Sequence, residues 1–281
     1  MTAPRDPAAS NGAGPLVVGD ESPSEGRRPV LVVREVSKRY GPVVALRGVS
    51  LVVGEGEVLA LVGDNGAGKS TLVSIISGVS RPDTGEVLVN DKPASGAGPR
   101  AAREAGIETV FQNLALVPTL DIAENVFLGR ELFRGGVVGR ALHNQDKRRM
   151  RRDVQSAFAR LGLRLPPVTA KAGALSGGQR QAVAIARAVL WGSKVVIMDE
   201  PLAALGVQQT EAVLGLVEGL REHGVATVLV SHNMEHVLRV ADRVAVLRHG
   251  LKVADVDLHR RQLSGMELVG LITGGMTEAE L

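Results

Sequence analysis

Short apolar runs alternate with longer amphipathic segments along most of the chain. The runs occupy residues 30–33, 58–62, 107–111, 195–198, 225–230 and 244–247. They contain few polar residues, as is typical of strands that are covered on both faces. Segments with helical periodicity separate most of these runs, which is the pattern of a sheet crossed by helices. The sequence therefore predicts an α/β fold with a mostly parallel core sheet built from these runs.

A second, antiparallel layer is predicted beside this sheet. Residues 43–53 and 86–90 are also apolar, but glycines at Gly54, Gly56 and Gly85 interrupt the chain around them. Such glycines favour hairpin turns over long crossover helices.

The middle of the chain differs from both layers. Residues 113–175 contain no convincing strand pattern. Residues 144–161 instead carry apolar side chains at helical spacing on a largely polar segment, which predicts a long helix. We therefore expect an inserted helical subdomain at about residues 113–180.

The two ends are expected to be tails. Residues 1–28 are rich in Pro, Gly, Ala, Ser and mixed charge, which predicts disorder, and they lack the apolar segment of a secretory signal. The main domain is expected at residues 29–273, followed by a short tail at 274–281. No apolar run approaches the ~18 residues of a membrane-spanning helix.

Composition excludes several classes of site. The 281 residues include no Cys, which rules out disulfides, a Cys-ligated zinc site and a catalytic thiol, and which fits a reducing compartment. The net charge is +3 and only 2% of residues are aromatic. A dedicated nucleic-acid binder usually has a stronger basic surface and stacking aromatics, so no nucleic-acid partner is expected.

One motif predicts a phosphate site. Residues 63–70 read Gly-Asp-Asn-Gly-Ala-Gly-Lys-Ser and match G-x-x-x-x-G-K-[ST] between a predicted strand and a predicted helix. The glycines let backbone N–H groups surround a phosphate at the positive end of the helix, while the Lys neutralises phosphate charge and the Ser hydroxyl ligates Mg²⁺. The residues expected to bind nucleotide here are Gly63, Asp64, Asn65, Gly66, Ala67, Gly68, Lys69, Ser70 and Thr71.

Two carboxylates follow the apolar run at residues 195–198. Phosphoryl-transfer sites place an acidic group at the end of a core strand to hold Mg²⁺, and Asp199 fits this role. Glu200 stands one position further and fits a general base toward the attacking water. Alone, this pattern is equally typical of a strand that ends in a polar turn. The phosphate loop makes the catalytic interpretation the stronger one.

The segment Leu-Ser-Gly-Gly-Gln-Arg-Gln at residues 175–181 is by itself a Ser-capped helix start that can bind an anion. With the two motifs around it, however, the chain resembles the nucleotide-binding subunits of ABC transporters over about residues 31–273. The resemblance implies a P-loop ABC cassette that binds ATP and Mg²⁺. It also implies that the signature contacts ATP held by a second copy, through Ser176, Gly177, Gly178 and Gln179.

The resemblance assigns three more residues. Tyr40 occupies the place of an aromatic residue that stacks on adenine, Gln112 that of a glutamine near Mg²⁺ and water, and His232 that of a histidine that hydrogen-bonds the γ-phosphate. The catalytic set is thus Lys69, Gln112, Glu200 and His232, with Mg²⁺ at Ser70, Gln112 and Asp199. Without the family, Tyr40 is an ordinary strand residue and His232 a structural hydrogen-bonding group.

The family pattern is not complete. Gly206 stands where many members have an Asp that supports communication between two copies, and Leu202 replaces a common Thr. Residues 63–68, 112–120 and 203–206 resemble instead the monosaccharide-importer branch, in its single-cassette form.

This resemblance implies an ATPase that powers import, with head-to-tail homodimer closure driven by ATP. It further implies separate permease subunits docked at a groove near Gln112, a sugar-binding protein, and a peripheral position at the cytoplasmic face of the inner membrane. The alternatives are an exporter ATPase for drugs or lipids, a non-transport ABC ATPase, and a nucleotide sensor without hydrolysis. The basic run at residues 147–152 is either a solvated helix face or a contact for anionic lipid or an acidic permease loop.

Overall fold

The computed structural model describes residues 23–24, 26–94, 96, 98–111, 114–135, 142–161, 165–203 and 205–281. The predicted N-terminal tail therefore lies mostly outside the described residues. Its last part is packed: the backbone N–H and hydroxyl of buried Ser24 donate to the Glu57 carboxylate, and Arg27 pairs with Asp242. Two buried carboxylates thus fix this end of the chain, because each requires charged or polar partners.

A sheet in the order β10-β9-β3-β8-β7-β6 forms the centre of the molecule. All neighbouring strands are parallel except β9 and β10, so the predicted mostly parallel sheet is confirmed. The strands are β3 (Val58–Gly63), β6 (Ile107–Val110), β7 (Val195–Asp199), β8 (Ala226–Val230), β9 (Arg243–Arg248) and β10 (Leu251–Asp257).

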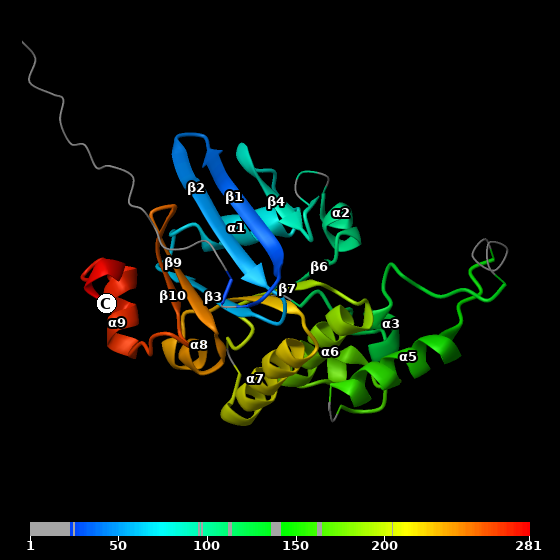
Figure 1. Cartoon of the computed structure of the whole chain (residues 1–281). Helices are drawn as coiled ribbons and strands as arrows, with labels where there is room; N and C mark the ends of the chain where they lie inside the picture. Colours follow the sequence, from blue (N-terminus) through cyan, green and yellow to red (C-terminus); the bar gives the residue numbers. More distant parts are fainter. Residues whose placement is uncertain are drawn as a thin grey trace, which may run out of the picture.

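The second layer is an antiparallel sheet in the order β2-β1-β4-β5, visible at the top of Figure 1. Its strands are β1 (Pro29–Tyr40), β2 (Val43–Gly54), β4 (Thr84–Val89) and β5 (Lys92–Pro93). The prediction that residues 30–33 belong to the core sheet is wrong, since they form part of β1. Two residues connect β1 to β2, and such a short link joins only antiparallel neighbours.

Helices fill the space between and below the sheets (Figure 1). Helix α1 (Lys69–Ile76) packs between the two sheets with contacts to β2, β3 and β7. On the opposite face of the core sheet α7 (Val207–Glu222) packs against β8, and α9 (Gly265–Thr273) packs against β9 and α8 (Met234–Val240). The short helix α2 (Pro99–Glu104) precedes β6.

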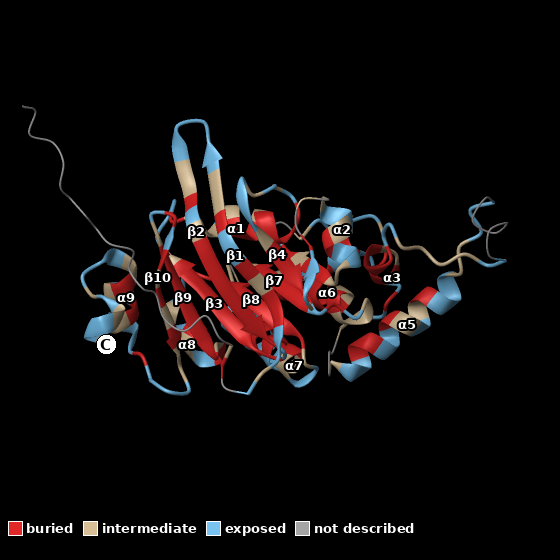
Figure 2. Cartoon of the chain, turned by 45° about the horizontal axis from the view of Figure 1, so that its top comes forward, coloured by how far each residue is buried: buried red, intermediate tan, exposed pale blue. Residues whose placement is uncertain are grey.

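Side chains along the core strands alternate between the two faces of the sheet, and both faces are covered. Leu59 and Leu61 of β3 pack into the cluster shared with the antiparallel sheet, whereas Ala60 and Val62 pack toward α8 and α9. Successive side chains of a strand point to opposite faces, so an all-apolar strand requires cover on both. Figure 2 shows the buried residues concentrated in these strands, with exposure at the β1–β2 hairpin tip.

A helical unit stands beside the core sheet at the right of Figure 1. It contains α3 (Ile122–Val126), α5 (Lys147–Arg160), the 3₁₀ turn η1 (Ala172–Ala174) and α6 (Gly177–Leu190), which share one apolar cluster. In the basic run that opens α5, Lys147, Arg149 and Arg151 pair with Glu124, Asp153 and Asp121. These pairs favour the solvated-face interpretation for these three residues of the run.

Several boundaries differ from those expected. Helix α5 begins three residues later than predicted, because the Asp146 carboxylate accepts from the Arg149 N–H and caps it there. Helix α6 begins at the signature glycines, directly after Ser176, which caps it. At the C-terminus, the 3₁₀ turn η2 (Glu278–Glu280) contacts β10, and Met276 packs against the α9 cluster.

Candidate nucleotide site

The phosphate-loop motif connects β3 to α1. Gly68 precedes the helix with φ 110°, a conformation that side chains with a Cβ rarely adopt. The Lys69 ammonium donates to the carbonyl oxygens of Gly63 (2.6 Å) and Asp64 (3.0 Å). The loop therefore folds around the Lys69 ammonium at the N-terminal end of α1, which is the end that favours anions.

Gly63 is required for a steric reason. Its φ is 149°, and an added Cβ would overlap the carbonyl oxygen of Leu247 on the neighbouring strand β9. Because that contact is with backbone, no side-chain movement would relieve it. The first glycine of the motif thus lets the loop leave β3 while β3 remains paired with β9.

A cleft of about 300 Å³ opens beside this loop. Residues 65–71 line one side of it, and Val43, Val44 and Ala45 of β2 line the other. The motifs do not include these β2 residues, although their position just after Tyr40 could have indicated them. Tyr40 pairs with Val43 across the hairpin but does not line the cleft; it is half exposed, and its hydroxyl lies 3.3 Å from the Ser80 hydroxyl.

The acidic pair lies at the same edge of the core sheet. Asp199 pairs with Val230 in register, and Leu61 pairs with Val230 from the other side. The strands β3, β8 and β7 are parallel neighbours, so the phosphate loop, His232 and Asp199 follow their adjacent carboxyl ends. This edge is where open α/β sheets bind their ligands.

The pKa of the Asp199 carboxyl reflects the groups around it. Burial raises the pKa of the Asp199 carboxyl, the neighbouring charge of Glu200 raises it further, and the Lys69 ammonium acts in the opposite direction. Lys69 and Asp199 therefore lie close enough to interact electrostatically, although they are 130 positions apart in the sequence. The structure brings the cation of the loop and the carboxylate of β7 to one site.

Glu200 and His232 are in direct contact. A Glu200 carboxylate oxygen lies 2.8 Å from His232 Nδ1, and the Glu200 N–H donates to the Val230 carbonyl oxygen. Glu200 has φ 52°, an uncommon conformation for a residue with a Cβ. The backbone turn and the histidine together orient the carboxylate that the sequence assigned as the general base.

The signature forms a separate site. Ser176 caps α6 by accepting from the Gln179 N–H, and the Gln179 side chain accepts from the Ser176 N–H. Ser176, Gly178 and Gln179 line a cleft of about 530 Å³ with the start of α7. Among the described residues this cleft shares no lining residue with the phosphate-loop cleft. The structure thus places the loop, the acidic pair and His232 together but leaves the signature apart within one chain.

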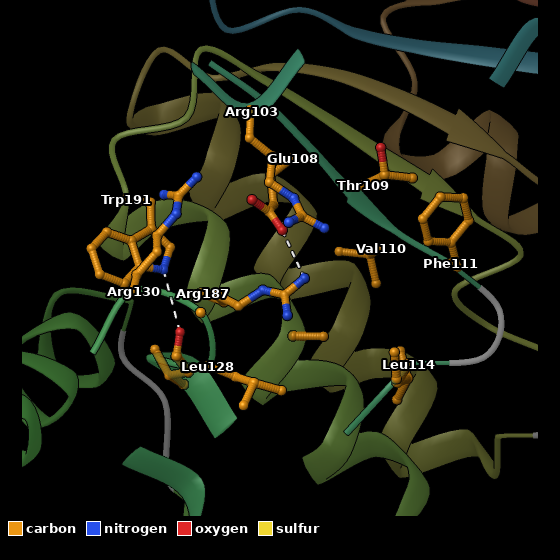
Figure 3. Close-up of a pocket in the computed structure, with 14 residues that line it drawn as sticks. Arg103, Glu108, Thr109, Val110, Phe111, Leu114, Leu128, Arg130, Arg187 and Trp191 are labelled. Atoms are coloured by element: carbon orange, nitrogen blue, oxygen red, sulfur yellow. Dashed lines mark hydrogen bonds and ion pairs between the residues drawn. The ribbon is translucent and has the colours of Figure 1, made fainter. Parts of the chain in front are cut away.

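Gln112 lies outside the described residues, so its predicted roles stay predictions. A groove of about 360 Å³ lies beside β6, lined by residues of this strand, by Phe111, Leu114 and Ala115, and by residues of α3, α6 and the segment after α3. The side chains of Phe111, Leu114 and Leu128 surround the groove in Figure 3, and Phe111 and Leu128 are exposed.

Charged groups mark the other side of this groove. The carboxylate of buried Glu108 pairs with Arg187 at 2.7 Å, and both residues line the groove. The Arg130 guanidinium lies over the Trp191 ring, 4.8 Å from its centroid, and the Trp191 N–H donates to the Val126 carbonyl oxygen (Figure 3). The sequence pattern does not indicate the pair of Glu108 and Arg187, because Glu108 stands inside an apolar strand.

The donor set fits a nucleoside triphosphate with Mg²⁺. Lys69 supplies a cation, Ser70 a hydroxyl, and Asp199 a carboxylate at the edge where the loop presents its backbone N–H groups. Hydroxyl and carboxylate oxygens are the ligands that Mg²⁺ prefers. The fold and this site define a P-loop nucleoside triphosphatase of the ATP-binding cassette class.

The sequence profile of the ABC transporter family matches residues 46–203. The chain belongs to this family, whose members bind ATP. The fructose import ATP-binding protein FrcA of Rhizobium meliloti is 45% identical over 249 residues, which cover 88% of this chain and 95% of that protein.

Two further relatives show the same degree of similarity. The xylose/arabinose import ATP-binding protein XylG of Sulfolobus acidocaldarius is 44% identical over 79% of this chain and 85% of its own length. The ribose import ATP-binding protein RbsA 1 of Burkholderia ambifaria is 43% identical over 90% of this chain. The match covers 48% of that protein, so the chain corresponds to about half of it.

Solved structures agree with this assignment. An ATP-binding cassette of an ABC transporter in its ADP conformation superposes with a TM-score of 0.72 at 26% identity, over 88% of this chain and 95% of that one. A dimeric cassette in a post-hydrolysis state, bound to ADP and Pi, superposes with a TM-score of 0.67 at 28% identity, over 81% of this chain and 98% of that one. Within the described part of the chain, none of the helices has the length and apolar character needed to cross a bilayer.

Proposed function

We propose that this chain is the ATP-hydrolysing subunit of an importer for a monosaccharide. The observation that carries the proposal is the convergence of Lys69, Asp199, Glu200 and His232 on one edge of the core sheet. Relatives at 43–45% identity are named as import proteins for fructose, xylose/arabinose and ribose. Residues of this chain do not select the sugar, which leaves substrate choice to other subunits.

Within the site each residue has a distinct role. The loop N–H groups and Lys69 hold the phosphates, while Ser70, Asp199 and Gln112 are the proposed ligands of Mg²⁺, which when bound neutralises phosphate charge. Tyr40 is half exposed at the end of β1, next to the cleft-lining Val43, and is proposed to stack on adenine.

Hydrolysis requires a base beside the γ-phosphate. Glu200 is proposed to accept a proton from the attacking water, and His232 holds its carboxylate in place at 2.8 Å. The Glu200 backbone is also fixed, because its N–H donates to the Val230 carbonyl oxygen. The presence of this pair supports hydrolysis over a nucleotide sensor.

A second copy is proposed to complete the site. The signature lies away from the phosphate loop in one chain, and Ser176 is exposed. A head-to-tail homodimer would bring the signature of one copy to the nucleotide of the other. A solved cassette bound to ADP and Pi is dimeric, which supports a dimer of this chain. In the proposed dimer, ATP binding brings the two copies together and phosphate release separates them.

The groove beside β6 is proposed to receive a cytoplasmic helix of a separate permease. Exposed Phe111 and Leu128 offer apolar contact area, while Arg130 and the Glu108–Arg187 pair form its polar side. Docking there would hold the chain as a peripheral subunit at the cytoplasmic face of the inner membrane, with a sugar-binding protein on the other side. The relatives named as import proteins support import over the exporter and non-transport alternatives.

The absence of Cys from the chain makes this docking testable. Leu128→Cys should react with a water-soluble maleimide in the purified protein and be protected in inside-out membrane vesicles from the native host. Met266→Cys is the matched control, since this exposed residue lies on α9 away from the groove. Equal labelling of Leu128→Cys in both preparations would contradict docking at the groove.

A further inference from the structure

The positive charge of the chain is concentrated in the helical unit. Residues 121–160 contain nine Arg and Lys against five Asp and Glu, a net charge of +4, whereas the whole chain carries +3. The rest of the chain is therefore slightly acidic. Helix α5 more than accounts for the excess, since it has six Arg and Lys and one Asp among its 14 residues. Such a concentration gives one part of the molecule a positive field.

The acidic side chains near α5 are committed to contacts within the fold. Asp121, Glu124 and Asp146 take part in the caps of α3 and α5, and the side chain of each is at most a quarter exposed. Asp153 pairs with Arg149 on α5 itself. The exposed face of α5 therefore presents mainly positive charge to the solvent.

Arg148 and Arg152 lie one turn apart on this face, and both are exposed. Neither forms an ion pair with a described residue, although Arg152 attracts the carboxylate of Asp146 at longer range. Like charges at this spacing destabilise a helix, and cations near its first turn also oppose the helix dipole. The two arginines thus weaken α5 in the isolated chain, and a negatively charged partner would turn this cost into a favourable interaction.

An exposed apolar side chain precedes this face. Leu142 is 74% exposed and lies in the arm that leads into α5, two residues after which Asn144 and then Gln145 return to the opposite arm, where Gln145 bridges Phe133. The loop formed by these arms starts directly after Arg130 of the groove beside β6 and extends outward from the helical unit (Figure 1). An apolar side chain near clustered cations fits the boundary between lipid headgroups and acyl chains.

We propose that the exposed face of α5, centred on Arg148 and Arg152, binds the anionic headgroups of membrane phospholipids. This contact adds to docking at the groove beside β6, and it rests on the proposed function only in that the chain works beside a membrane. The clefts described above include no residue of α5, so this face is an open surface and not a pocket for one small anion. A bilayer presents many phosphates in one plane, and separate guanidinium groups along a helix can each bind one of them.

Sedimentation of the purified full-length protein with vesicles tests the proposal. Vesicles of phosphatidylcholine with phosphatidylglycerol are compared with vesicles of phosphatidylcholine alone. The double variant Arg148→Ala with Arg152→Ala removes two charges from the face, and the corresponding double Lys variant keeps them. The matched control is Arg260→Ala with Arg261→Ala, which removes two exposed charges beside α9, on the other side of the molecule (Figure 1). Circular dichroism and thermal unfolding report whether each variant retains its fold.

The wild type should bind the vesicles that contain phosphatidylglycerol and not those of phosphatidylcholine alone, and added NaCl should weaken the binding. The double Ala variant of α5 should bind about 30-fold more weakly, about fivefold for each cation lost. The double Lys variant and the matched control should remain within about threefold of the wild type.

Hydrolysis of ATP by the double Ala variant in solution should equal that of the wild type, because neither arginine lines the phosphate-loop cleft. Vesicle binding and the proposed ATPase activity can therefore fail independently. Equal weakening in the matched control would reduce the effect to total charge and overturn the proposal. A wild type that does not bind phosphatidylglycerol vesicles would overturn it as well and would favour an acidic permease loop as the partner of α5.

Discussion

A Glu200 carboxylate oxygen lies 2.8 Å from Nδ1 of His232, although 32 positions separate the two residues. They meet because β7 and β8 are parallel neighbours whose carboxyl ends are in register, with Asp199 opposite Val230. The Glu200 side chain is 20% exposed and that of His232 75% exposed. The histidine is therefore accessible to a phosphate while it holds the more buried carboxylate.

Glu200→Gln is expected to bind ATP normally but to hydrolyse it at least about 100-fold more slowly, because a neutral amide cannot accept the proton from water. ATP should then hold the closed homodimer, which size-exclusion chromatography with and without ATP would detect. Phosphate release close to the wild-type rate would refute the role of Glu200 as the base.

His232→Ala should lower kcat with little change in nucleotide affinity, since the histidine acts partly through Glu200. If so, the fold reduction in hydrolysis rate caused by His232→Ala should be much smaller in the Glu200→Gln background than in the wild-type background. Steady-state hydrolysis by the two single variants and the double variant measures this. Independent, multiplicative effects would show that His232 does not act through Glu200.

Asp199→Asn should stabilise the nucleotide-free protein while abolishing Mg²⁺-dependent hydrolysis. The folded-state pKa of Asp199 is raised, mainly by burial, so its ionisation costs stability as the pH rises through that value. The gain of the variant should therefore be absent below the ordinary pKa of an Asp, appear as the pH rises toward the raised pKa of Asp199 and stay constant above it, as followed by thermal unfolding. Asp91→Asn, at an exposed carboxylate, is the matched control.

Two glycine substitutions should have opposite effects. Gly63→Ala forces a Cβ onto the Leu247 carbonyl oxygen and should cost several kcal/mol, at the upper end of single-residue effects, with loss of ATP binding. Gly215→Ala adds a Cβ to the middle of α7 in open space and should stabilise the protein by about 0.5–1 kcal/mol. Urea unfolding measures both, and destabilisation by Gly215→Ala would contradict the described α7 surface.

Asp242 joins the N-terminal segment to the core. Its carboxylate, 1% exposed, accepts from the Val58 N–H at 2.8 Å and pairs with Arg27, Arg221 and His259. Asp242→Asn should lower the free energy of unfolding by about 3 kcal/mol, the lower end of the range for broken buried ion pairs, because the partners of Asp242 are partly exposed.

The exposed pair of Arg34 and Glu86 provides the comparison for this change. Glu86→Gln should cost less than about 1 kcal/mol, as is usual for ion pairs at the surface. Equal losses for Asp242→Asn and Glu86→Gln in urea unfolding would show that the network around Asp242 adds no more than a surface ion pair.

The alternation of apolar runs was sufficient to predict the parallel sheet, and the phosphate-loop motif located its cleft, because strand burial and loop conformation both depend on nearby residues. Which strands pair depends also on the segments that connect them, and residues 30–33 were assigned to the wrong sheet for that reason. β10 was missed because its buried positions include Lys252, which is paired with Asp255. The tight turn at His249 and Gly250, both with positive φ, was the signal that could have indicated it.

Within the site, the motifs assigned separate roles to Glu200 and His232 and did not predict the contact between them. The spacing of Gly206 and Gln209 matches that of Ser176 and Gln179, and both pairs cap a helix. The contact of Gln209 with Gly178 could not be predicted, because it depends on how α6 and α7 pack. Pairing of Glu108 with Arg187 is likewise a product of tertiary structure.

The central claim is that hydrolysis at Glu200 powers sugar uptake. The most direct measurement is uptake of labelled fructose, ribose and xylose by the native host lacking this gene, complemented with either the wild-type chain or Glu200→Gln. We expect uptake of one sugar to be lost and to return only with the wild type. Unchanged uptake of all the sugars, with active ATPase in the purified protein, would contradict the importer assignment, and full rescue by Glu200→Gln would contradict the coupling of uptake to hydrolysis.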